Sequence, residues 1–113
     1  MSIEIITRKS FRGSYECKSN IEIGDNRILR ISTYRQANGV LITSATCLKR
    51  EDRGGSIVEI WAMFGDFSST LCKSQPRRVT AAICEAQHRA VLANAAAIQA
   101  EALAFYAAKA SAA

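Results

Sequence analysis

The sequence predicts an α+β fold in which an antiparallel sheet of four or five strands is followed by one long C-terminal helix rich in alanine. Residues 1–73 alternate β-branched and aromatic residues with polar ones between turns rich in Gly and Asn, as strands do. Residues 74–111 contain no Gly, and their commonest residue is Ala, the best helix former. At 113 residues the chain is long enough for one core, so we expect a single domain over residues 1–113.

Four segments of the first half have the pattern of strands: Phe11–Lys18, Arg27–Arg35, Val40–Lys49 and Ser56–Phe67. Asn38-Gly39 separates the second segment from the third and predicts a tight hairpin, because both residue types accept positive φ. A looser turn, EDRGGS, precedes the fourth segment, and a further strand over Ile3–Thr7 would make the sheet five-stranded. Short turns between successive strands predict an antiparallel meander, since parallel strands need a long crossover.

The predicted helix begins at Ser74-Gln75-Pro76, where Ser can cap the helix and Pro is tolerated in its first turn. A helix of about 33 residues would be about 50 Å long at a rise of about 1.5 Å per residue. Because the strands run only about 20–30 Å, we expect the helix either to break near Asn94 or to project beyond the sheet.

Two apolar stripes lie on this helix. The first is expected to pack on the sheet and consists of Val79, Ile83, Ala86 and Ala90. The second has a seven-residue spacing and consists of Val91, Ile98 and Phe105. Because the second stripe needs its own cover, we predict a homodimer in which these three residues form the interface. A helical hairpin that covers itself is the alternative.

The charge of the chain favours a polyanionic partner. Fifteen Lys and Arg against ten Asp and Glu give a net charge of +5 and a pI of about 9.3. A basic pI that serves solubility alone explains the composition equally well. The N-terminal residues MSIEIITRKS do not resemble a secretory signal, and no apolar run approaches the roughly 20 residues of a membrane span. We therefore expect a cytoplasmic protein that does not enter a membrane.

A single helix covers one face of an antiparallel sheet and leaves the other open. The covered face is expected to be the more aliphatic one, with Leu29, Ile31, Val40, Ile42, Val58, Ile60, Phe64 and either Phe11 or Tyr15. The open face then holds a mixture of basic, polar and aromatic residues: Arg12, Ser14, Lys18, Arg30, Ser32, Tyr34, Thr43, Cys47, Lys49, Glu59, Trp61 and Met63.

Basic residues interleaved with exposed aromatic rings are what a single-stranded nucleic acid requires, because cations neutralise phosphates and unpaired bases stack on the rings. The residues predicted to bind DNA or RNA on the open face are Arg12, Arg30, Tyr34, Lys49 and Trp61. Two further phosphate contacts are expected from Arg77 and Arg78 at the helix start. The alternative for Trp61 is burial against protein, and Glu59 can pair with Arg30 or Lys49 across strands.

We predict that the protein is not an enzyme and uses neither metal nor cofactor. His88 is the only histidine, and it lies four residues after Cys84 on one helical face. No second His, no C-x-x-C pair and no glycine-rich phosphate loop accompanies them. A histidine that is solvated or at the edge of the core is the simpler interpretation.

The order of four antiparallel strands and one long helix, over residues 11–110, is similar to that of the transcriptional coactivators that bind single-stranded DNA and of the Whirly-type proteins. In those families the sheet binds unpaired DNA and the helix supports oligomer assembly. The resemblance is one of topology, since no stretch matches the Whirly motif KGKAAL, and it transfers no residue roles.

The rival function is that of a small protein-interaction module, an inhibitor or adaptor of the kind encoded by phages and mobile elements, which binds a larger host or defence complex. Trp61, Met63 and Tyr34 would then form a protein-contact patch, because such residues are enriched at interfaces. A purely structural subunit is the third possibility. Salt dependence separates the first two, since phosphate contacts weaken steeply with added salt.

Overall fold

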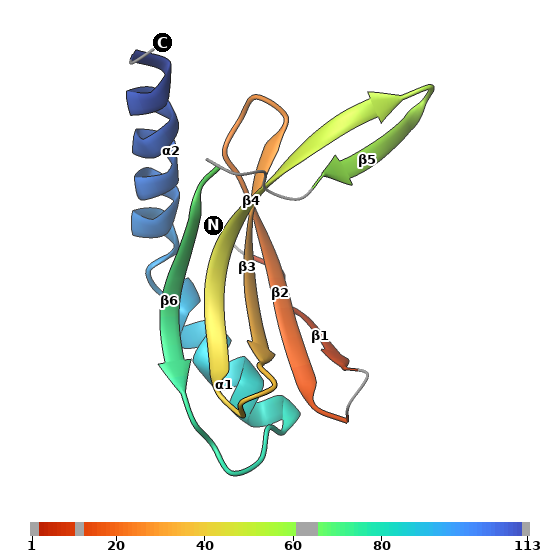
Figure 1. The fold of residues 1–113 in the computed structure, drawn as a ribbon, viewed down its shortest axis with the longest axis vertical. Helices are drawn as coiled ribbons and strands as arrows, with labels where there is room; N and C mark the ends of the chain where they lie inside the picture. Colours follow the sequence, from red (N-terminus) through yellow and green to blue (C-terminus); the bar gives the residue numbers. More distant parts are fainter. Residues whose placement is uncertain (1–2, 11–12, 61–65, 112–113) are drawn as a thin grey trace.

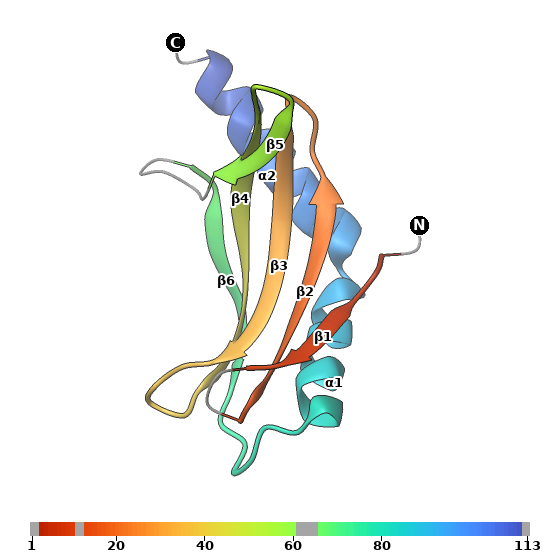
Figure 2. The same cartoon turned by 90° about the vertical axis from the view of Figure 1, so that its right-hand side faces the viewer.

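The computed structural model describes residues 3–10, 13–60 and 66–111 and confirms the α+β prediction (Figure 1). The six strands are β1 (Ile6–Lys9), β2 (Tyr15–Glu22), β3 (Arg27–Arg35), β4 (Leu41–Arg53), β5 (Ser56–Ile60) and β6 (Ser68–Ser74). The two helices are α1 (Ala81–Leu92) and α2 (Ala95–Ser111). Both helices lie on one side of the sheet (Figure 2).

The sheet is an antiparallel meander from β1 to β4, and β4 is the central strand that pairs with three others. One edge of β4 pairs with β3, and the opposite edge pairs with β5 over Lys49–Arg53 and with β6 over Leu41–Thr46. β5 and the end of β4 project from the body as a hairpin (Figure 1). The hairpin predicted at Asn38-Gly39 is present, and Gly39 takes a φ of 88°.

The fourth predicted strand is wrong in its extent. It ends at Ile60 as β5, and Trp61, Met63 and Phe64 lie outside the described residues. A sixth strand, β6, was not predicted. Thr70 pairs with Ser44 and Cys72 with Thr43, so that Leu71 is the extra residue of a β-bulge. A bulge breaks the two-residue alternation by which a strand is recognised.

The register corrects the predicted sheet faces. Leu29, Ile31 and Thr33 of β3 lie opposite Cys47, Ala45 and Thr43 of β4, and all six are buried. Thr43 and Cys47 therefore lie on the covered face of the sheet, whereas the sequence pattern predicted them on the open face. Ile42 lies opposite Tyr34, on the other face. The prediction placed the larger aliphatic residues of β4 inside, whereas α1 packs on the smaller ones, and Gln87 of α1 donates to Thr43 Oγ1 at 3.1 Å.

The C-terminal helix starts later than predicted and breaks where predicted. Residues 68–74 are strand, and Thr80 caps α1 by accepting a hydrogen bond from the Ile83 backbone N–H at 3.2 Å. The chain turns by 61° between α1 and α2, at Ala93 and Asn94. The bend lets both helices stay close to the short strands.

The two predicted helix stripes are also corrected. Cys84, His88 and Val91 are the buried residues of α1, while Ile83, Ala86 and Ala90 are exposed. Val91 and Ile98 pack in the core of the chain itself, with Ile21, Leu29 and Ile31. These two residues therefore need no partner subunit to cover them. Phe105 is partly exposed and packs edge-to-face on Phe67 at 5.6 Å. A homodimer formed through the C-terminal helix stays a prediction.

Candidate nucleic-acid interface

The face of the sheet opposite the helices presents cross-strand rows of side chains. One row runs through Lys18, Ser32, Ser44 and Thr70, and the next through Tyr34, Ile42 and Lys73. We call these seven residues the lower sheet face, because β3 ends toward the bottom of Figure 1. Its two rows contain two lysines, four hydroxyl or phenol groups and no carboxylate. Tyr34 is 39% exposed, so its ring is open to a flat ligand.

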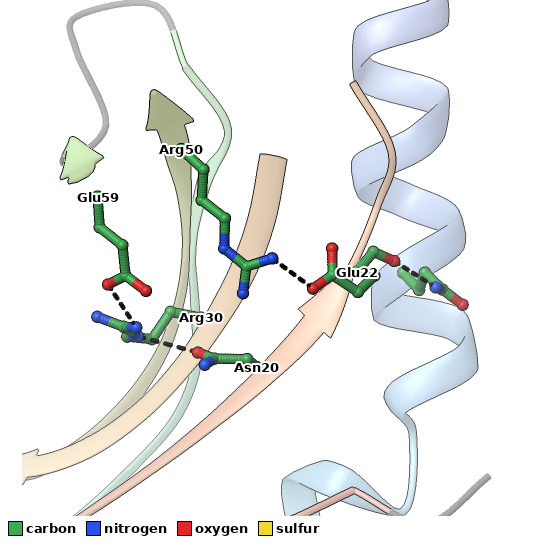
Figure 3. Close-up of polar contacts among 6 residues, drawn as sticks. Asn20, Glu22, Arg30, Arg50 and Glu59 are labelled. Atoms are coloured by element: carbon green, nitrogen blue, oxygen red, sulfur yellow. Dashed lines mark hydrogen bonds and ion pairs between the residues drawn. The ribbon is translucent and has the colours of Figure 1, made fainter. Parts of the chain in front are cut away.

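Above the lower sheet face, two arginines of this side of the sheet are paired with carboxylates (Figure 3). Arg30 donates from Nη2 to Glu59 Oε2 at 2.9 Å and from Nε to Asn20 Oδ1 at 3.0 Å. Arg50 donates from Nη1 to Glu22 Oε1 at 2.9 Å. The Arg30 side chain is only 14% exposed. The cross-strand pairing considered for Glu59 is therefore formed, and Arg30 is held by protein groups.

Ile28 and Leu48 form a fully buried cross-strand pair on the same side of the sheet as Arg30. These two side chains are therefore not available to a ligand, although the charged groups beside them, Glu22 and Glu59, are exposed.

Five exposed cations lie toward this end of the molecule, and we call them the basic end: Lys9, Arg35, Lys73, Arg77 and Arg78. Lys73 stands on the open face, whereas the register places Lys9 and Arg35 on the helix side of the sheet. None of the five forms an ion pair within the part of the chain that the structure describes. The nearby Glu16 carboxylate is already paired with Arg8. The basic end therefore carries positive charge that no ion pair among the described residues neutralises.

A small apolar cluster holds the basic end together. Leu41 and Val79 are buried in it, and Tyr15 packs against them. Arg35 pairs with Leu41 across the β3–β4 ladder, Lys9 pairs with Tyr15, and Arg78 precedes Val79 in the chain. Cations that are distant in sequence thus converge because their neighbours share one core.

The structure places the predicted binding residues in different parts of the molecule. Tyr34 is exposed on the lower sheet face, and Arg77 and Arg78 are exposed but precede the cap of α1 instead of lying in its first turn. Lys49 is exposed, but it lies opposite Arg27, on the helix side of the sheet, and so does not share a face with Arg30. Arg12 and Trp61 lie outside the described residues.

Four cations of the lower sheet face and the basic end were not predicted as binding residues, namely Lys9, Lys18, Arg35 and Lys73. Lys73 was missed because β6 was missed. Arg35 and Lys9 stand at strand ends, where a two-residue pattern no longer indicates direction. Lys9 belongs to a basic cluster with Arg8 and Arg12 that the sequence shows, and Lys18 was expected on the open face, whereas only the overall excess of Lys and Arg pointed to Arg35 and Lys73.

Beneath the lower sheet face lies a buried polar network centred on His88. The imidazole contacts Ser19 Oγ through Nε2 at 2.8 Å and Thr33 Oγ1 through Nδ1 at 2.7 Å. Thr33 Oγ1 lies 2.7 Å from Thr43 Oγ1, to which Gln87 donates. His88 is fully buried, so the prediction of a solvated or core-edge histidine is wrong. Burial, together with the positive charge of Arg89, lowers the pKa of His88 to about 4.

The geometry of Cys84 and His88 gives neither residue a reactive environment. The Cys84 thiol donates to the Tyr15 and Thr33 carbonyl oxygens, and burial raises its pKa to about 12. A thiol that stays protonated is a poor nucleophile. No group of three or more His, Cys, Asp or Glu among residues 3–10, 13–60 and 66–111 is arranged to hold a metal ion.

These features define a class of protein: an α+β domain in which a bent helix pair covers one face of a six-stranded antiparallel sheet and the other face ends in a basic surface. Comparisons with protein families, with characterised proteins and with solved structures found no match to this chain. Within the described residues neither helix alone is long and apolar enough to cross a membrane; only the bent pair passes that test, by length and composition.

Proposed function

We propose that this protein binds single-stranded nucleic acid on the lower sheet face and at the basic end. The observation that carries the proposal is the contrast in charge pairing: among residues 3–10, 13–60 and 66–111 the cations of this region have no carboxylate partners, whereas Arg30 and Arg50 above it do. Polyanion binding needs cations that are free to take up phosphates. The proposal involves no catalysis.

The chemistry of the lower sheet face suits an unpaired strand better than a duplex. A base can stack on the exposed ring of Tyr34, because every base has a flat π-face. The hydroxyl groups of Ser32, Ser44 and Thr70 can donate to phosphate oxygens without selecting a sequence. The rows of the lower sheet face themselves present no helix or two-stranded ribbon that could enter a major groove. We therefore propose binding without sequence specificity.

The test is a fluorescence-anisotropy titration of a labelled mixed-sequence 20-mer, single-stranded or duplex, at about 50 and 200 mM salt. With about four phosphates neutralised, the expected log–log slope is about −3, so that affinity falls about 50-fold over this range. We expect the single strand to bind more tightly than the duplex.

The matched variants localise the site. The double variant Lys73→Gln with Arg78→Gln removes two cations of the basic end. The double variant Arg53→Gln with Arg89→Gln removes two exposed cations elsewhere. The first pair should make the salt slope shallower by about 1.4, and the second should leave it nearly unchanged. Equal losses from both pairs would mean a diffuse charge effect. Binding that salt does not alter, or no binding at all, would contradict the proposal.

A further inference from the structure

A cavity of about 450 Å³ lies between the β2–β3 turn and the second half of α2, away from the lower sheet face and the basic end. Its walls come from Ile23, Asp25 and Arg27 on the turn side and from Leu103, Tyr106, Ala107, Lys109 and Ala110 on the helix side. Small-molecule sites usually have this form: a concave, mostly apolar wall with a few polar groups. The helix side supplies most of the apolar wall.

Arg27 is the fixed polar group of this cavity. Its guanidinium lies 4.3 Å from the centroid of the Tyr106 ring. The Tyr106 hydroxyl in turn accepts from the Phe67 backbone N–H at 3.1 Å and donates to Asp66 Oδ1 at 3.0 Å. The ring that supports Arg27 is therefore anchored at its far end, and the guanidinium is held in place before any ligand arrives.

The positive charge of Arg27 is poorly neutralised. Its closest carboxylate oxygen is Asp25 Oδ2, at 4.0 Å, and the Asp25 side chain is 91% exposed. Arg27 Nε is buried, and no hydrogen-bond acceptor reaches it among the residues that the structure describes. Buried donors are normally satisfied. The Arg27 side chain is 24% exposed, so a planar anion in the cavity could accept hydrogen bonds from the exposed edge of the guanidinium in the paired geometry that carboxylates favour.

We propose that this cavity binds a small carboxylate with an apolar body. Arg27 holds the carboxylate, and the wall of Leu103 and Ala107 receives the apolar part. A carboxylate matches the planar guanidinium, and an apolar body matches the wall. This binding site is separate from the proposed nucleic-acid surface and does not depend on it.

The test is a chemical-shift titration of the isotope-labelled full chain with decanoate, and in parallel with 1-decanol, below the concentrations at which either aggregates. The two probes share the apolar chain and differ in the anionic group. We expect decanoate to shift amide signals of residues 23–27 and 103–110 and to bind about tenfold more tightly than decanol. Arg27→Gln should reduce that tenfold difference to less than twofold.

Two further variants keep the outcome interpretable if Arg27→Gln perturbs folding. Leu103 is 46% exposed, so Leu103→Asp should fold while placing a negative charge on the wall, and it should abolish decanoate binding. Arg53→Gln, at the distant β4–β5 hairpin, should bind decanoate as the unmodified chain does. Equal affinity for the two probes, shifts at other residues, no binding, or unchanged binding in both Arg27→Gln and Leu103→Asp would each overturn the proposal.

Discussion

The upper and lower parts of the sheet both carry cations that are exposed or partly buried, and the two parts differ in how these cations are paired with carboxylates. Above, Arg30 and Arg50 are paired with Glu59 and Glu22. Below, Lys73 and its neighbours at the basic end have no ion-pair partners in the described chain. A count of Lys and Arg cannot separate the two regions. What separates them is whether a carboxylate from an adjacent strand lies within reach.

The interior beneath the two parts of the sheet also differs in polarity. The core that receives Ile98 of α2 is largely apolar, with Ile21, Leu29 and Phe67. The interior under the lower sheet face instead contains the hydrogen-bonded chain of Ser19, His88, Thr33, Thr43 and Gln87. The stability contributed by the interior under the lower sheet face should therefore depend on pH, whereas the stability contributed by the apolar core should not.

The largest expected effect is the pH dependence of stability from His88. Its folded pKa of about 4 lies below the ordinary value of 6.5. Between pH 6.5 and 4 the unfolded chain binds a proton at this residue that the folded chain does not, so the free energy of unfolding falls by up to about 3 kcal/mol. Urea unfolding at pH 7, 5.5 and 4, followed by circular dichroism, measures this loss. His88→Gln should have a flatter pH dependence, and parallel curves would contradict the assignment.

Charge reversal at the lower region is expected to have a comparable effect on binding. Lys73→Glu with Arg78→Glu replaces two attractive charges by two repulsive ones beside the proposed phosphate path. We expect about a 100-fold loss of affinity for a single-stranded oligonucleotide at about 100 mM salt. The matched reversal, Arg53→Glu with Arg89→Glu, should cost less than about fivefold. If the second pair is as damaging as the first, the two regions do not differ in binding.

Thr33→Val tests whether the buried network stabilises the lower region. The substitution keeps the shape and leaves His88 Nδ1 and Thr43 Oγ1 each without one partner, at an expected cost of about 2 kcal/mol. The control on the same strand is Ile31→Val, which removes one buried methyl group for about 1 kcal/mol. Denaturant midpoints at pH 7 compare the two, and a smaller loss for Thr33→Val would show that the hydroxyl adds little.

The smallest change in oligonucleotide affinity is expected from Glu59→Gln. This variant tests most directly whether ion pairing is what distinguishes the upper cations from the lower ones. This change removes the carboxylate that holds Arg30 without removing the cation. If pairing is what withholds Arg30 from an oligonucleotide, affinity should rise about threefold and the salt slope should steepen by about 0.7. Anisotropy titrations of this variant and of the double variant Arg30→Gln with Glu59→Gln measure the gain, which the double variant should lack.

The sequence was sufficient for the features that depend on local chemistry. The α+β order and the turn at Asn38-Gly39 follow from backbone preferences of neighbouring residues. The break near Asn94 was one of two outcomes expected from the length of an unbroken helix compared with that of the strands. Features that depend on distant partners were missed. The buried side of α1 is marked by Cys84 and His88, which do not resemble core residues until Ser19 and Thr33 from two strands satisfy the imidazole.

The candidate site was predictable only in part for the same reason. Tyr34, Arg77 and Arg78 were identified from residue type, and all three are exposed. Whether Arg30 is available depends on Glu59, which is 29 positions away in the chain. The face on which Lys49 stands depends on the β3–β4 register, which a pattern taken strand by strand does not determine.

The bulge at Leu71 determines which side chains of β6 meet solvent. With the extra residue, Lys73 stands opposite Ile42 on the open side and Ser74 contacts Gln87 on the helix side. Deletion of Leu71 would leave a regular ladder in which Lys73 still stands opposite Ile42 on the open side. If the strand instead kept Leu71 and lost the bulge, every side chain after Thr70 would change sides, and the ammonium group of Lys73 would turn toward α1 and the interior. The bulge therefore places the charge of Lys73 on the surface.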